Sequence, residues 1–103
     1  MKLSKLVLAM CLATGVMSTA VAQVVMRNAI SVGQNSHAGE AIDTLAREVE
    51  KRTNGRIVIK NFYSGSLGGE REVMESVQLG TQELAHNSTG PVPNFVPETR
   101  ILD

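Results

Sequence analysis

The chain has 103 residues, with ten basic and ten acidic side chains and a formal net charge of zero. Without a basic excess it lacks the electrostatic signature of proteins that bind nucleic acid or an anionic membrane. Its length allows one small domain, near the size at which a single hydrophobic core becomes marginal.

The amino terminus has the pattern of a secretory signal peptide. Two lysines precede an apolar run at residues 6–16, and the small residues at 20–22 come directly before Gln23. The run is shorter than the ~20 apolar residues that a membrane-spanning helix needs. We therefore predict a signal peptide helix at residues 1–22. Its removal takes away Cys11, the only cysteine, and leaves 81 residues with a net charge of −2. Export without disulfides fits a bacterial periplasm.

The first part of the predicted mature chain reads as a strand followed by a helix. Residues 24–32 are rich in β-branched side chains, and a small polar loop follows at residues 33–37. Apolar residues then recur at helical spacing, which predicts a helix over residues 38–52 that begins at an Asn35 or Ser36 cap. Three side chains should pack on the strands, namely Ile42, Leu45 and Val49, and three should face water, namely Glu40, Arg47 and Glu48.

A second strand and helix follow. Residues 56–63 predict a mostly buried strand, and the glycine-containing loop 64–69 separates it from a helix that starts near Glu70 and stops at Gly80. Glu70 and Glu72 fall in the first turn, where the helix dipole favours negative charge. A third strand is expected at residues 82–88 because of its place in the order more than its composition. Prolines then turn the chain away.

This order predicts an α/β fold with a β-α-β-α-β parallel sheet. Parallel sheets bind ligands beyond the carboxyl ends of their strands, which here means the loops 33–37, 64–69 and 88–94. All three loops are small and polar. This property is common to α/β folds, so it indicates an anionic ligand only weakly.

Catalytic chemistry finds no support in the sequence. His37 is interpreted as a solvated or capping residue and His86 as a hydrogen-bonded residue of the sheet. Glu70 and Glu72 lie two apart on a helix and point to different sides, so they do not form an acid and base pair. No metal-ligand spacing and no phosphate or dinucleotide motif is present. We therefore expect no enzyme activity, no metal and no cofactor.

Several short runs together resemble a known family. They are Gly55 to Ile59, Ser66 to Glu72, Val77 to Thr81, Ser88 to Pro91 and Asn94 to Glu98. In this order and at this spacing they resemble the amino-terminal part of a DctP-type solute-binding protein, the periplasmic receptor of a tripartite ATP-independent periplasmic (TRAP) transporter. The resemblance covers essentially all of the predicted mature chain. It favours a TRAP receptor over two alternatives, the receptor of an ATP-driven importer and a small secreted enzyme.

The resemblance implies that residues 23–103 are the amino-terminal part of lobe 1 of a type II periplasmic-binding-protein fold, with the second lobe absent. Such a receptor would capture a small organic acid, for example a C4-dicarboxylate, and deliver it to the small and large membrane subunits of a TRAP permease. The family's first-lobe contacts correspond here to Ser31, Gln34, Asn35, Ser88 and Thr89.

The resemblance also marks what is missing or different in this sequence. The family's arginine that clamps the ligand carboxylate matches neither Arg71 nor Arg100 and belongs to the absent part. Many members have a histidine where Ser36 stands, whereas His37 lies one position later. Ser88 replaces a carboxylate that accompanies sialic acid specificity, so the sequence leaves the acid unidentified.

Overall fold

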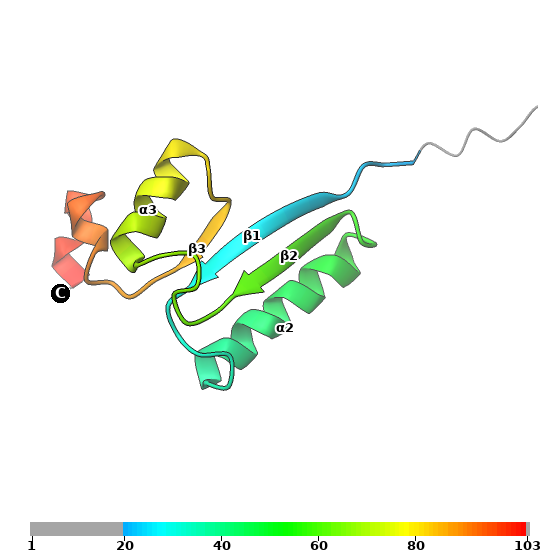
Figure 1. Ribbon diagram of the computed structural model, residues 1–103, viewed down its shortest axis with the longest axis horizontal. Helices are drawn as coiled ribbons and strands as arrows, with labels where there is room; N and C mark the ends of the chain where they lie inside the picture. Colours follow the sequence, from blue (N-terminus) through cyan, green and yellow to red (C-terminus); the bar gives the residue numbers. More distant parts are fainter. Residues whose placement is uncertain (1–19, 103) are drawn as a thin grey trace, which may run out of the picture.

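The computed structural model of the protein describes residues 20–102. Most of the predicted signal peptide falls on residues 1–19 and lies outside this described part. The elements in chain order are β1 (Val24–Ile30), α2 (His37–Arg52), β2 (Ile57–Phe62), α3 (Glu70–Leu79), β3 (Leu84–His86) and two 3₁₀ turns, η1 (Val92–Asn94) and η2 (Pro97–Leu102). The predicted β-α-β-α-β order is confirmed (Figure 1).

The three strands form one parallel sheet in the order β2-β1-β3. β1 pairs with β2 along nearly its whole length, from Val24 opposite Ile57 to Ala29 opposite Phe62. Its pairing with β3 is confined to the carboxyl end, where Asn28 lies opposite Leu84. The first strand of the chain is therefore the central strand, and its carboxyl end is the only part with neighbours on both sides.

Helix α2 begins and ends where local signals place it. Ser36 is the N-cap, and its Oγ accepts a hydrogen bond of 3.1 Å from the backbone N–H of Gly39. Lys51 and Arg52 occupy the last turn, where positive charge suits the helix dipole. The chain then reverses through the left-handed conformation at residues 54 and 55, with φ of 53° and 75°. The prediction of residues 38–52 is correct to within one residue.

Helix α3 is equally well defined by its ends. It starts directly after Gly69 with two glutamates in its first turn, and it ends at Gly80, whose φ of 76° is left-handed. The backbone N–H of Gly80 donates to the carbonyl oxygen of Val77 at 3.1 Å. A glycine is favoured at this position because it has no Cβ to clash in the left-handed region.

Strand β3 is shorter than predicted, covering residues 84–86 instead of 82–88. Gln82 explains the difference at the front, because its side chain is buried and its Nε2 donates to the carbonyl oxygen of Arg27 at 2.6 Å. The glutamine side chain thus supplies a hydrogen bond to β1 that a longer strand would have supplied from its backbone.

One prediction about the core is wrong. Leu45 is 55 % exposed, although we expected it to pack on the strands. Helix α2 lies against β2 and presents Ile42 to the sheet. Leu45 is about 60° round the helix axis from Ile42, and the sheet does not cover it. Val49 is half-buried, and Arg47 is exposed as predicted. Glu40 is exposed and Glu48 is half-exposed. The buried apolar residues are Ala29, Ile30, Ile42 and Val73.

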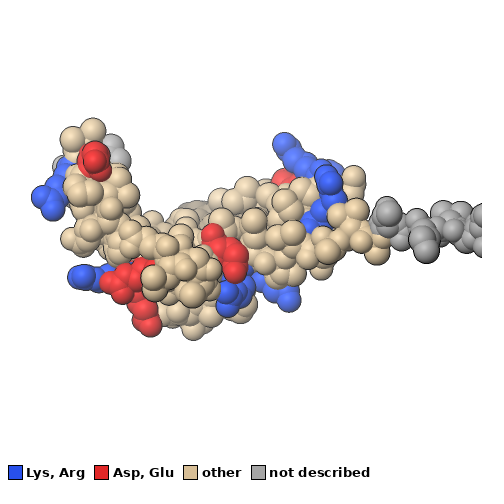
Figure 2. All heavy atoms as spheres, turned by 90° about the horizontal axis from the view of Figure 1, so that it is seen from above, with Lys and Arg blue, Asp and Glu red and all other residues tan. Residues whose placement is uncertain are grey.

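The surface shows no patch of one charge on the face seen in Figure 2, where acidic and basic side chains are interspersed. This distribution agrees with the balanced composition of the chain. Within residues 20–102, none of the helices has the length and apolar character needed to span a membrane.

Candidate ligand-binding site

The carboxyl ends of the parallel strands meet at one edge of the sheet, and backbone hydrogen bonds join the loops that follow them. The N–H of Gly65, in the β2–α3 loop, donates to the carbonyl oxygen of Ile30 at 3.0 Å. The N–H of Ser31 donates to the carbonyl oxygen of His86 at 3.4 Å, which links the ends of β1 and β3. The predicted ligand loops therefore lie together where α/β sheets bind ligands.

Glu70 connects the end of β3 to the first turn of α3. Its Oε1 accepts a hydrogen bond of 2.9 Å from the backbone N–H of Ser88, and its Oε2 accepts one of 2.6 Å from the Ser88 hydroxyl. Asn87 Nδ2 donates to the Glu70 carbonyl oxygen at 3.2 Å. The hydrogen bonds from Ser88, with a further one from Ser31, hold the pKa of Glu70 below its usual value. Glu70 is therefore an ionised acceptor at neutral pH.

A second polar network, centred on Asp43 of α2, holds the β1–α2 loop. Gln34 Nε2 donates to Asp43 Oδ2 at 3.2 Å, and Asn61 Nδ2 donates to Asp43 Oδ1 at 3.0 Å. The Tyr63 hydroxyl donates to the same Oδ1. These hydrogen bonds, that of Tyr63 foremost, lower the pKa of Asp43. Burial and the hydrogen bond to Asp43 raise the pKa of Tyr63 to about 12, so its hydroxyl keeps its proton and remains a donor.

The structure places the predicted site residues in three settings. Ser31 and Ser88 come together at Glu70. Gln34 is bonded to α2 through Asp43, and both Asn35 and Thr89 are exposed in the loops that follow β1 and β3.

Two residues at this edge were missed by the sequence analysis as parts of the site. Glu70 was interpreted only as a charge favoured by the helix dipole. Its position as the first helical residue after a predicted ligand loop is the signal that could have identified it. Asp43 gave no such signal, because its partners Asn61 and Tyr63 lie 18 and 20 positions away in the sequence.

The two histidines take different positions from each other. His37 is the exposed first residue of α2, next to the Ser36 cap, in agreement with a solvated role. His86 lies in β3 as expected, and its carbonyl oxygen accepts a hydrogen bond from the Ser31 N–H at 3.4 Å. Its side-chain Nδ1 is buried with no hydrogen-bond partner in the described chain. Between residues 20 and 102, histidine, cysteine and acidic side chains form no group of three that could hold a metal ion.

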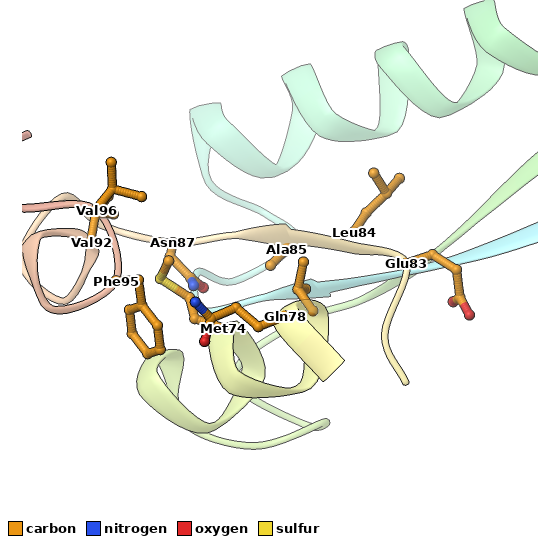
Figure 3. A pocket seen from close by; sticks show the side chains of 10 residues that line it. Met74, Gln78, Glu83, Leu84, Ala85, Asn87, Val92, Phe95 and Val96 are labelled. Atoms are coloured by element: carbon orange, nitrogen blue, oxygen red, sulfur yellow. The ribbon is translucent and has the colours of Figure 1, made fainter. Parts of the chain in front are cut away.

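A groove of about 450 Å³ lies along β3, apart from the polar edge (Figure 3). In this view α2 lies on one side of the sheet and α3 on the other, with Phe95 and Val96 at one end of the groove and Glu83 at the other. Its walls are mostly apolar and come from α3, β3 and the η1 region: Met74, Val77, Gln78, Glu83, Leu84, Ala85, Asn87, Val92, Phe95 and Val96. An isolated carboxylate would lose its hydration here without a cationic partner, so the groove does not suit an organic acid.

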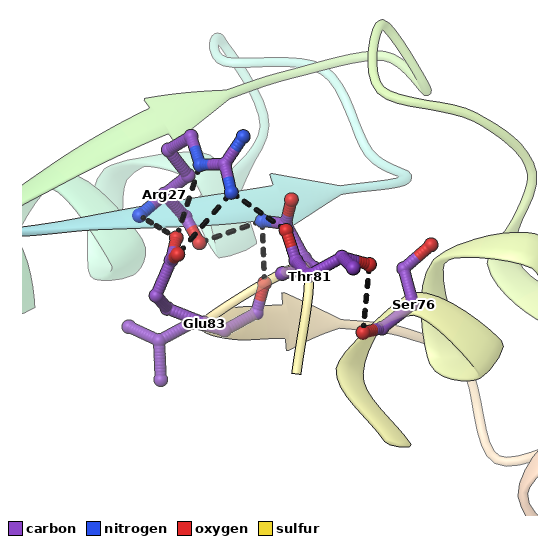
Figure 4. A network of polar contacts seen from close by, with 6 residues as sticks. Arg27, Ser76, Thr81 and Glu83 are labelled. Carbon is purple, nitrogen blue, oxygen red and sulfur yellow. Dashed lines mark hydrogen bonds and ion pairs between the residues drawn. The ribbon is translucent and has the colours of Figure 1, made fainter. Parts of the chain in front are cut away.

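An ion pair at the amino end of β3 fastens this strand to β1 (Figure 4). Arg27 Nε donates to Glu83 Oε2 at 3.1 Å, and the Arg27 backbone N–H donates to the same oxygen at 2.9 Å. Arg27 Nη2 also donates to the Thr81 carbonyl oxygen at 2.6 Å. The hydrogen bonds and charge of Arg27 lower the pKa of Glu83 to about 2. Since its charge is already paired, Arg27 is a structural residue rather than a candidate ligand clamp.

The sequence profile of the DctP family, described as bacterial extracellular solute-binding protein, family 7, matches residues 29–103. The match starts in β1 and includes every later element of the fold. The chain belongs to the DctP family. Both the predicted resemblance and the predicted fold class are confirmed.

Other DctP-type proteins are similar in sequence and structure. A solute-binding protein of Verminephrobacter eiseniae is 63% identical over 86 residues, which are 84% of this chain and 26% of that protein. The crystal structure of a TRAP periplasmic solute-binding protein from Polaromonas sp. JS666, bound to D-erythronate, is 49% identical with a TM-score of 0.75, over 79% of this chain and 27% of that one. A TRAP periplasmic solute-binding protein from Sulfurospirillum deleyianum, with bound succinate, is 28% identical with a TM-score of 0.70, over 80% of this chain and 26% of that one. The chain spans about a quarter of the length of these relatives.

Proposed function

We propose that this chain is the amino-terminal part of lobe 1 of a periplasmic receptor that captures a small organic acid for a TRAP transporter. In this proposal residues 1–22 are the signal peptide and residues 23–103 begin the first lobe. The family match over residues 29–103 is the observation that carries the proposal. Relatives described with D-erythronate and with succinate support an organic acid as the solute.

The polar carboxyl edge of the sheet is this chain's contribution to the binding site. Hydroxyl and amide groups there orient the solute, and they belong to Ser31, Gln34, Asn35, Ser88 and Thr89. An arginine of the second lobe holds the carboxylate, because a guanidinium pairs with a carboxylate through two parallel hydrogen bonds. The receptor then passes the solute unchanged to the small and large membrane subunits of the permease. It acts as a binding protein without a cofactor and not as an enzyme.

Two classes of acid are candidates for the solute. A C4-dicarboxylate is the first, in line with the succinate of the S. deleyianum structure. A hydroxy monocarboxylate is the second, in line with the D-erythronate of the Polaromonas structure. Both have four carbons and differ at the end away from the first carboxylate, which is charged in succinate and carries hydroxyl groups in D-erythronate.

Calorimetric titration tests this function on the purified mature product of the gene that encodes this chain. Succinate, D-erythronate and the uncharged polyol erythritol serve as ligands. We expect binding of at least one acid and none of erythritol, since the arginine contact requires a carboxylate. Binding of neither acid, or equal binding of erythritol and D-erythronate, would contradict the proposal.

A further inference from the structure

Ser88 already holds a carboxylate, and that carboxylate belongs to the protein. The backbone N–H and the hydroxyl of Ser88 each donate to a different oxygen of Glu70, at 2.9 and 2.6 Å. These are the two donors that Ser88 could offer to an anionic ligand. A solute that reaches the end of β3 therefore finds the donors of Ser88 in use and a negative charge beside them.

Acceptors, in contrast, remain available at this point. A serine hydroxyl that donates one hydrogen bond still has acceptor lone pairs, and each carboxylate oxygen can accept more than one hydrogen bond. Glu70 is only partly buried and Ser88 is exposed, so a ligand can approach both. The cavity on the inner side of Glu70, lined also by Ser31 and Asn87, has a volume of only about 10 Å³, too small for a ligand group, so contact must come from the open side.

The helix that starts at this point does not restore a site for an anion. The positive end of the α3 dipole is offset by Glu70 and Glu72, which both lie in the first turn. A second ligand carboxylate placed here would face like charge and be repelled. A ligand hydroxyl would instead donate a hydrogen bond to an ionised oxygen, which is stronger than a bond between neutral groups.

We propose that Glu70 is a specificity-determining residue, which makes the end of β3 accept the hydroxyl-bearing end of a hydroxy monocarboxylate and reject the second carboxylate of a dicarboxylate. This inference rests on the proposed function as an organic-acid receptor. It also fixes the direction of the solute, since the single carboxylate points away from Glu70 and toward the second lobe. The pKa of Glu70, lowered by its hydrogen bonds with Ser88, keeps the charge in place at neutral pH.

D-Erythronate and succinate form a matched pair for the test because they have the same number of carbons. Their affinities are measured by calorimetry on the mature product of the gene. The same measurement is made on a chimera in which this chain replaces the matching segment of the V. eiseniae relative. The variant Glu70→Gln keeps the size and an acceptor for Ser88 but removes the charge. Glu70→Asp keeps the charge, and Glu75→Gln removes a charge from α3 outside its first turn as a matched control.

We expect the unmodified receptor to prefer D-erythronate over succinate. Glu70→Gln should lower this preference by at least about tenfold, which corresponds to about 1.4 kcal/mol. Glu70→Asp and Glu75→Gln should both retain the preference. Because a residue that only fastens α3 to β3 would affect both ligands alike, the ratio of affinities separates selectivity from structural support.

Three results would overturn the inference. The first is an unmodified receptor that prefers succinate, and the second is an equal loss of affinity for both acids in Glu70→Gln. The third result concerns the case in which Glu70→Gln does not fold. The chimera that carries Glu70→Asp is then measured, and a loss of the preference for D-erythronate despite the retained charge counts against the proposal. An unmodified receptor that binds no acid at all is a different outcome, which rejects the proposed function itself.

Discussion

Replacing Gly39 with alanine is the most direct test of how the β1–α2 loop is held. Gly39 is buried in the first turn of α2, where the backbone of the preceding loop passes closely over it. A Cβ at this position would overlap the carbonyl oxygen of Gln34 and lie 2.7 Å from that of Gly33. Both are backbone atoms that cannot rotate away, so the loop that carries Gln34 and Asn35 must move.

The size of the effect follows from these contacts. Ordinary carbon contacts lie at about 3.5–4.0 Å, so the loop must shift by more than about 1 Å. Inserting a methyl group into a packed site costs about 1–3 kcal/mol of folding free energy. At about 2–4 °C per kcal/mol for a domain of 150–250 residues, the melting temperature should fall by several degrees. The same shift moves Gln34 relative to Asp43, so solute affinity should also fall.

Calorimetry of the mature receptor measures both quantities, by heat unfolding and by acid titration. Gly33→Ala is the matched control, because a Cβ there would meet only Ser64 Oγ at 3.9 Å and its φ is not left-handed. We expect the control to unfold and bind like the unmodified protein. If Gly39→Ala behaves like Gly33→Ala, the close passage of the loop over α2 is not a feature of the receptor in solution.

Three further predictions concern the site, the pH dependence and the isolated fragment. Ser88→Ala and Asn35→Ala should each weaken solute binding by about 1 kcal/mol or more, the scale of a lost buried hydrogen bond, and calorimetry showing unchanged affinity in both would remove them from the site. Because Arg27 lowers the pKa of Glu83 from 4.5 to about 2, this pair stabilises the fold above pH 4.5 and loses its effect as the pH falls toward 2. Melting temperatures of the mature receptor and of Glu83→Gln should accordingly differ at neutral pH and converge near pH 2, whereas a constant difference would contradict this. Residues 23–103 alone should bind no acid and should melt without a cooperative transition. A monomer that binds an acid and melts cooperatively would instead show that this quarter of the receptor suffices.

The parts of the fold that were predictable from the sequence depend on signals close together in the chain. The cap at Ser36, the apolar spacing of α2 and the stop at Gly80 are local, and each was predicted to within one residue. The exposure of Leu45 could not be predicted from local signals. Apolar spacing identifies the side of a helix that faces the sheet, but not how far the sheet extends over that side. Its 55 % exposure reflects the single strand, β2, against which α2 lies.

The candidate site shows the same division between local and distant information. The sequence indicated which loops meet, because the carboxyl ends of parallel strands lie at one edge. It did not indicate that Glu70 would bond Ser88, a contact between residues 18 positions apart. An acidic residue at a helix start has the same local signature whether it stands free in solvent or bonds a second loop, so only the three-dimensional arrangement distinguishes the two.

The position of β1 in the middle of the sheet has a consequence for how the chain folds. Each strand pairing spans a long stretch of sequence, as in the Asn28–Asn61 side-chain contact at 33 positions and the Arg27–Glu83 contact at 56. Chains dominated by such distant contacts fold slowly, because a long loop must close before any pairing is gained. The first strand to emerge therefore waits for both neighbours, and the last of them, β3, contributes only three residues.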